Sequence, residues 1–248
     1  MATPDGALRD LPDVVARVLD DFVAAAREAF GDDLVSVVLF GSAAEGALRA
    51  TSDVNLIVIL RAFDRARADA VRDAARVAHA AAGLRAMFLL REEVEQAAAA
   101  FAQKFADVRR RHRVLWGEDP FARLAVPRAA LAARTNQVLL NLALRLRAQY
   151  VERSLHEEQL VSVVAAAAAP LRTAAAAIVE LESGPALAPK EALRRLAPTL
   201  RAPGWETTLA RVSEARETRA LAPGVAGETT LALADLAQRL RARLAALG

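Results

Sequence analysis

The sequence reads Leu39-Phe40-Gly41-Ser42-Ala43-Ala44-Glu45-Gly46 at the point that decides its fold. After a short connection it continues as Ser52-Asp53-Val54-Asn55-Leu56-Ile57-Val58. Residues 34–40 are apolar and rich in β-branched side chains, and this run stops at Gly41, which predicts a buried strand. Residues 54–60 form a second run of the same kind. The quoted segment is therefore predicted to be two strands, the first ending in Gly-Ser and the second opening with Ser-Asp.

The ends of these two strands carry residue types that bind phosphate groups and divalent cations. Gly41 lets the backbone approach a phosphate closely, and Ser42 can donate its hydroxyl and its backbone N–H to phosphate oxygens. If the following residues turn into a helix, the N-terminus of that helix adds further N–H donors. Asp53 and Asn55 are two residues apart on a strand, so both side chains point to one face. Two oxygen donors beside a phosphate cradle suit a hard cation such as Mg²⁺.

This pattern resembles the nucleotidyltransferase superfamily, which contains DNA polymerase beta, the kanamycin and streptomycin nucleotidyltransferases and the small MNT proteins. In their signature one strand ends in Gly-Ser and the next opens with Asp-x-Asp or Asp-x-Glu. Gly41, Ser42 and Asp53 match it, and the resemblance is strongest over residues 34–60. A weaker likeness to two-domain aminoglycoside adenylyltransferases rests on the helical second half and on Leu-Trp-Gly-Glu-Asp-Pro at 115–120. The resemblance implies a nucleotidyltransferase-like fold, a nucleoside triphosphate as substrate or ligand, and Mg²⁺.

The chain departs from the family pattern at the second acid, which is Asn55. In active members, two carboxylates bridge two magnesium ions that activate the attacking hydroxyl and hold the triphosphate. Asn55 supplies one neutral carbonyl oxygen, and Arg85 stands where the resemblance predicts a third carboxylate. We expect Gly41 and Ser42 to bind nucleotide, Asp53 and Asn55 to occupy the catalytic position, and Asp53 alone to hold Mg²⁺ weakly. Other acids that could approach the site are Glu92, Glu93 and Asp107.

Each of these residues also has a purely structural interpretation. Gly41-Ser42 could form only a tight turn, and Ser52-Asp53 is a common turn pair that could cap the start of a strand. Asn55 fits a hydrogen-bonding residue inside the fold better than a metal ligand. Glu45 is expected to face solvent.

The rest of the chain divides into two parts. Helical spacing over about 11–30, 64–82 and 91–101, with a third strand over 84–90, predicts an α/β or α+β domain with a small mixed sheet over residues 1–126. After Pro127 the strand signals stop, which predicts an all-α helical bundle over 127–248. Its long helices are expected over 129–151 and 157–181, the second bent or broken at Pro170. Three further short helices should follow.

Composition narrows the class of protein. The 248 residues are 54% hydrophobic and 25% charged, enough apolar material for a buried core. There is no cysteine, which excludes disulfides and thiolate metal sites. We find no signal peptide, and the apolar run 160–171 is too short to span a bilayer, so we expect a cytoplasmic protein without membrane contact. The net charge of +3 is small for a protein that binds nucleic acid.

The most basic run is Arg-Arg-Arg-His-Arg at 109–113. It could be an anion clamp for a triphosphate or RNA. The alternative is a solvated helix surface paired with Asp107, Glu118 and Asp119. We favour the helix surface, because no aromatic residues interleave the run to stack on bases.

Three functions compete at this point. The first is transfer of a nucleoside monophosphate from a nucleoside triphosphate to a hydroxyl on a small molecule or protein, weak or absent because of Asn55. The second is a non-catalytic protein of the same fold that binds a nucleotide. The third is an antitoxin-like interaction module, which a large exposed Leu and Val face over 205–247 would favour.

Overall fold

A computed structural model describes residue 8 and residues 10–48, 53–184 and 187–247. The chain folds into two compact units, Met1–Val126 and Pro127–Gly248. Each unit is built around its own apolar core, and the two are described in turn.

The first unit contains a four-stranded mixed sheet. The strands are β1 (Leu34–Phe40), β2 (Val54–Leu60), β3 (Leu84–Leu90) and β4 (His112–Gly117). Their order is β3-β2-β1-β4, with β2 parallel to β3 and antiparallel to β1, and with β4 antiparallel to β1. The predicted α/β unit with a small mixed sheet is confirmed, and the first three strands begin and end at the expected residues.

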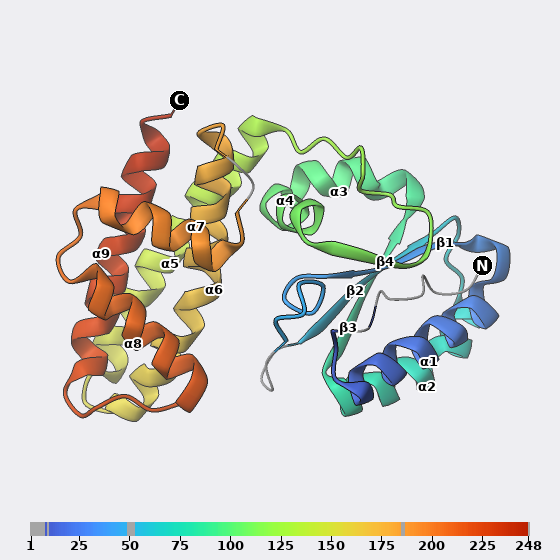
Figure 1. The fold of residues 1–248 in the computed structure, drawn as a ribbon, viewed down its shortest axis with the longest axis horizontal. Coiled ribbons are helices and arrows are strands. Elements are labelled where there is room, and N and C mark those ends of the chain that lie inside the picture. The colour runs from blue at the N-terminus through green and yellow to red at the C-terminus, as the bar shows by residue number, and fades with distance from the viewer. Residues whose placement is uncertain (1–7, 9, 49–52, 185–186, 248) are drawn as a thin grey trace. The chain divides into compact units, whose positions relative to one another are not determined.

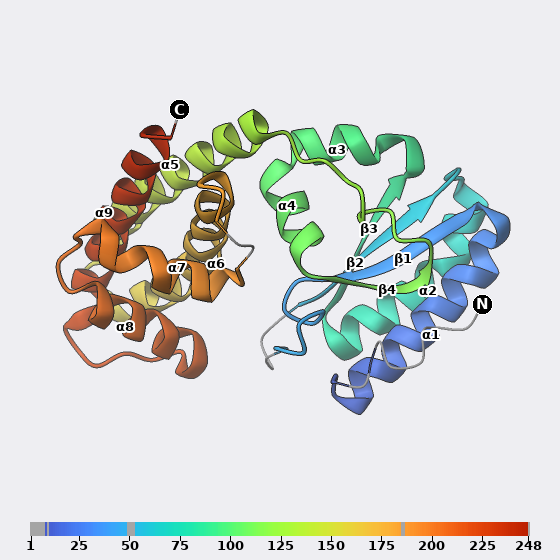
Figure 2. The ribbon, with the colours of Figure 1, turned by 45° about the horizontal axis from the view of Figure 1, so that its top comes forward.

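Helices cover both faces of this sheet (Figures 1 and 2). On one face lie α1 (Asp13–Phe30) and α2 (Arg65–Ala82), and on the other α3 (Val94–Ala100) and α4 (Ala102–Arg110). Strand side chains alternate between the two cores. On β2, Leu56 and Val58 join the α1–α2 core, whereas Ile57 and Ile59 join the α3–α4 core. Both faces are buried, which explains why the strands read as continuous apolar runs.

Strand β4 was missing from the sequence prediction, which placed the end of the basic run on a helix surface. Its apolar part is only Val114-Leu115-Trp116, too short to stand out beside four arginines. The strand forms because β1 offers it a free edge, with a register shift between Val37 and Val38. Gly117 ends β4 with φ +83°, packed tightly against the backbone of β1.

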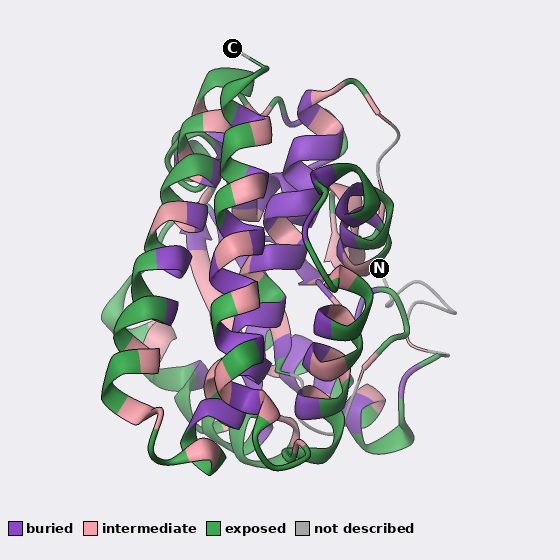
Figure 3. Ribbon diagram, turned by 90° about the vertical axis from the view of Figure 1, so that its left-hand side faces the viewer, coloured by how far each residue is buried: buried purple, intermediate pink, exposed green. Residues whose placement is uncertain are grey.

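The second unit is a helical bundle, and no strand occurs among its described residues. Figure 3 shows its helices with buried residues along one side and exposed residues along the other. Of the bend or break predicted at Pro170, the break is wrong, because one helix runs through the proline, and α9 is longer than the short helices expected. The helices are α5 (Arg128–Arg153), α6 (Glu157–Leu181), α7 (Pro189–Leu196), α8 (Trp205–Thr218) and α9 (Val225–Ala245).

Helix α6 is the most apolar helix of the unit. By length and composition alone it could cross a membrane, but 72% of its most apolar window is buried inside the protein. Such burial is typical of the core helix of a water-soluble bundle.

Glu157, the first residue of α6, connects this end of α6 to the start of α9. Its carboxylate accepts hydrogen bonds from the backbone N–H groups of Gly224 and Ala226 at the start of α9. These bonds, with that to Gly224 the strongest, lower the pKa of Glu157. A carboxylate with a lowered pKa stabilises the fold above its ordinary pKa, and this contribution disappears as the pH falls through the folded-state value.

We therefore expect Glu157→Gln to lower the free energy of unfolding at pH 7 and to lower it by less at pH 3. Urea denaturation of both proteins at the two pH values measures this difference. Glu158→Gln is the matched control. Glu158 is exposed, and its Oε1 lies at the long distance of 3.9 Å from Nδ1 of His156. An equal loss at both pH values would contradict the assignment.

Candidate functional site

The two halves of the Gly-Ser and Asp-x-Asn motif meet at one end of the sheet. Phe40, the last residue of β1, pairs in register with Asn55, the second residue of β2. Gly41 follows directly, with φ +82°, a conformation that favours glycine. A Cβ added there would meet no atom within 4 Å, so the space above Gly41 is open.

The segment after Gly41 is a series of turns rather than the helix considered above. Ala44 N–H donates to the Gly41 carbonyl at 3.1 Å, and Ala47 N–H donates to that of Ser42 at 2.9 Å. Ser42 is half-buried, and its expected neighbour Ser52 lies outside the described residues. A turn presents backbone N–H groups without a helix dipole, so phosphate binding here would depend on local donors alone.

Asp53 and Asn55 lie beside an arginine. Asp53 is exposed, and its Oδ2 is 3.4 Å from Nε of Arg85. Arg85 is the register partner of Asn55 on β3, which places it on the neighbouring strand where the resemblance predicts the third acid. The Asn55 side-chain amide donates to the Asp53 carbonyl at 3.2 Å. Asn55 thus makes a hydrogen bond to the backbone, but it is half-buried and not enclosed in the fold as its structural interpretation predicts.

These donors do not fit a magnesium site of the kind the family implies. Mg²⁺ needs oxygen ligands in near-octahedral geometry, commonly from one or two carboxylates and substrate phosphates. Here the only carboxylate of the motif is ion-paired with Arg85. No group of three acidic or histidine side chains that could hold a metal ion occurs in the part of the chain that the structure describes.

Asp107, which the sequence offered as a further acid for the site, instead pairs with two arginines. Its two carboxylate oxygens accept hydrogen bonds from Arg111 at 2.8 and 2.6 Å, and Arg110 lies 3.6 Å away. Arg111 also bonds to Glu45 at 2.8 Å, so Glu45 is paired rather than simply solvated. Burial alone would lower the pKa of Arg111, but the bonds to Asp107 and Glu45 outweigh it and raise the pKa.

The basic run makes the expected pairs with Asp107 and Asp119, but it is not one helix surface. It crosses from the end of α4 into β4, and several of its charges pair inside the unit. His112 lies 3.1 Å from Asp119, and Arg113 lies 3.2 Å from Asp10. Two of its arginine side chains, Arg110 and Arg111, are at most 17% exposed. This pairing anchors the turn 41–46 to the sheet and leaves little of the run for a ligand.

Lys104 is a site residue that the sequence reasoning missed. It lies on α4, and its Nζ stands 5.4 Å from the centre of the Phe40 ring, within the range of a cation–π contact. Burial lowers the pKa of Lys104. Only its rarity could have drawn attention to it, since the chain has two lysines among 33 basic residues.

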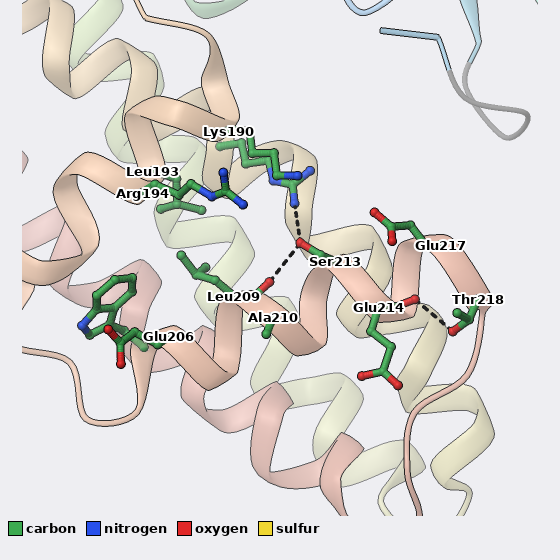
Figure 4. Close-up of a pocket in the computed structure, with 12 residues that line it drawn as sticks. Lys190, Leu193, Arg194, Glu206, Leu209, Ala210, Ser213, Glu214, Glu217 and Thr218 are labelled. Atoms are coloured by element: carbon green, nitrogen blue, oxygen red, sulfur yellow. Dashed lines mark hydrogen bonds between the residues drawn. The ribbon is translucent and has the colours of Figure 1, made fainter.

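The helical unit holds a separate cavity of about 590 Å³, between α6, α7 and α8 (Figure 4). Arg172, which is buried, donates to the Ser213 hydroxyl at 3.4 Å. Basic and acidic side chains share the lining, among them Lys190, Arg194, Glu206, Glu214 and Glu217. No motif in the sequence marked this cavity.

Comparison with known proteins supports the fold inferred from the motif. No protein-family model matches the chain. Among curated proteins, the chain is similar to "Putative protein adenylyltransferase MJ1305" of Methanocaldococcus jannaschii, at 44% identity over 52 residues, or 21% of this chain. The chain spans only 35% of the length of that relative.

Among solved structures, the chain is similar to spectinomycin adenyltransferase AAD(9) from Enterococcus faecialis, determined with ATP and spectinomycin. The TM-score is 0.60, and the match covers 90% of this chain and 98% of that one at 12% sequence identity. The chain therefore has a nucleotidyltransferase-like fold followed by a helical unit, as in that adenyltransferase.

Proposed function

We propose that this protein binds a nucleoside triphosphate at the end of the sheet formed by Gly41, Ser42, Asp53 and Asn55. In this proposal, transfer of the nucleoside monophosphate to a hydroxyl is weak or absent. The observation that carries the proposal is the pairing of Asp53 with Arg85 beside Asn55, in a fold that otherwise keeps the Gly-Ser turn.

Transfer is expected to be weak because of the charge of the side chains at this end of the sheet. Two carboxylates on one strand face repel each other, and a divalent cation relieves that repulsion. Asn55 removes one of these charges, and Arg85 neutralises the other. What is left is an end of the sheet that is open above Gly41 and lacks the anionic ligands that metal-assisted phosphoryl chemistry uses.

The fold neighbour determined with ATP makes ATP the first nucleotide to test. Its second ligand, spectinomycin, supports a small-molecule hydroxyl as the acceptor of any residual reaction, whereas the name of the curated relative supports a protein hydroxyl. Incubation with labelled ATP and each class of acceptor separates these two.

Asn55→Asp tests the proposal. We expect the wild type to bind ATP and to show little transfer of label. The variant should gain a magnesium-dependent rise in ATP affinity of several-fold, or about 1–2 kcal/mol. Calorimetric titration with ATP in Mg²⁺ and in EDTA measures the rise. Activity need not return, because Arg85 remains beside the restored acid.

Asp64→Asn is a control for a change of one charge near the sheet, since Asp64 caps the start of α2 and lies outside the motif. The proposal would be contradicted if the wild type transferred the nucleotide efficiently and Asn55→Asp did not change that rate. Absence of any nucleotide binding would also sink it.

The antitoxin-like alternative receives no comparable support. Among the described residues of 205–247, the exposed large hydrophobic side chains are Leu231 and Leu247, each 43% exposed. Two separated side chains, one on α9 and one just after its end, do not form the extended apolar face that this alternative predicts.

A further inference from the structure

Two cationic side chains lie near Asn55, one on the neighbouring strand β3 and one on helix α4, over the neighbouring strand β1. On β3, Arg85 is the register partner of Asn55. On β1, the register partner is Phe40, and Lys104 lies over the ring of Phe40. We propose that Arg85 and Lys104, in place of a divalent metal ion, balance the charge of a nucleoside phosphate bound at this end of the sheet. This inference rests on the proposed function.

Alternation of side chains along the strands puts the two cations on one face. Asn55 precedes Ile57 and Ile59, which point to the α3–α4 core, and Arg85 precedes Met87, which packs against the same core. Phe40 also packs there, under Lys104 of α4. The face that would carry metal-binding acids in the family pattern therefore carries one carboxylate and two cations.

The net charge of this group decides what it attracts. A pair of acids with no partner is anionic and requires a cation before a triphosphate can approach. Asp53 with Arg85 is neutral, and Lys104 adds one positive charge, so the group attracts an anion directly. Arginine suits this role, because its planar guanidinium can donate two parallel hydrogen bonds to a phosphate.

The surroundings of Arg85 and Lys104 leave both side chains able to contact a bound phosphate. The Arg85 side chain is 64% exposed and its contact with Asp53 at 3.4 Å is a surface ion pair, which costs little to open. Lys104 is half-buried, and burial lowers its pKa by removing part of the hydration of its ammonium, for which the described residues supply no carboxylate partner. A phosphate oxygen would supply the missing counter-charge.

Calorimetric titration of the full chain with ATP, once in excess Mg²⁺ and once in EDTA, tests the inference. We expect wild-type affinities in the two conditions to agree within about threefold. Arg85→Gln and Lys104→Gln should each weaken ATP binding in EDTA about tenfold, the size of a charge-assisted hydrogen bond. Arg85→Lys, which keeps the charge, should recover most of the loss.

Arg91→Gln is the matched control, because Arg91 follows the opposite end of β3 and pairs with Glu118 at 3.4 Å. It should leave ATP binding unchanged. Wild-type binding that requires Mg²⁺ would overturn the inference while the proposed function stands. Metal-independent binding that both Gln variants retain would also overturn it. Failure of the wild type to bind ATP in either condition would remove the proposed function itself.

Discussion

Gly117→Ala is expected to destabilise the first unit by about 4 kcal/mol, as the sum of a strained backbone and a collision. Gly117 has φ +83°, and a Cβ there would collide with the carbonyl oxygen of Val35 and come within 2.9 Å of the Ser36 Cα. Both contacts are backbone atoms of β1, so no rotamer change relieves them. The edge pairing of β4 with β1 would have to open. Guanidinium chloride denaturation followed by circular dichroism measures the loss.

Gly31→Ala separates the two contributions. Gly31 lies in the same unit with φ +53°, but a Cβ there would meet no atom within 4 Å. It should cost only the backbone strain, about 1–3 kcal/mol. If Gly117→Ala costs no more than Gly31→Ala, the close approach of β4 to β1 is wrong.

Asp107→Ala is expected to cost about 3 kcal/mol, because it removes the carboxylate that two arginines share in a place poor in water. The Asp107 side chain is 12% exposed, and those of Arg110 and Arg111 are 5% and 17% exposed. Glu45 would still pair with Arg111, which keeps the expected loss near the lower end of the range for a broken buried ion pair. The same denaturation experiment measures it.

An exposed pair provides the comparison. Asp69→Ala removes the partner of Arg65 and Arg72 on α2, where these arginine side chains are 94% and 60% exposed. Exposed pairs contribute about 0–1 kcal/mol. Equal losses for Asp107→Ala and Asp69→Ala would mean that the cluster around Asp107 is solvated and does not anchor the turn 41–46.

The parts of the fold that could be predicted are those encoded by long, uninterrupted patterns. Strands β1, β2 and β3 are seven-residue apolar runs with clear ends, and their limits agree with the structure. Strand β4 is six residues long, half of them polar or glycine, and it exists through its pairing with β1. Helix α6 continues through Pro170 because its neighbours bury it on most sides, and tertiary packing outweighs the local cost of the proline.

The site could be predicted only as far as local spacing reaches. Two-residue spacing put Asp53 and Asn55 at one end of β2, and the position of Arg85 on the next strand followed from the family pattern. The contact between Lys104 and the Phe40 ring depends on how α4 packs on the sheet. No local sequence pattern around residue 104 predicts that packing. The pairing of Arg111 with Asp107 and Glu45 joins residues up to 66 positions apart, beyond any local pattern.

Helix α6 also has a consequence for the synthesis of the chain. It packs against α5, α7, α8 and α9, so its apolar surface is covered by segments on both sides of it in sequence. The last of these, α9, begins at Val225, well after α6 ends at Leu181. Because the chain is made from its N-terminus, α6 is complete before α9 exists, and part of the cover of this apolar helix is then still unmade. The bundle therefore completes its folding only after α9 has been made, and until then the uncovered surface of α6 can form non-native apolar contacts.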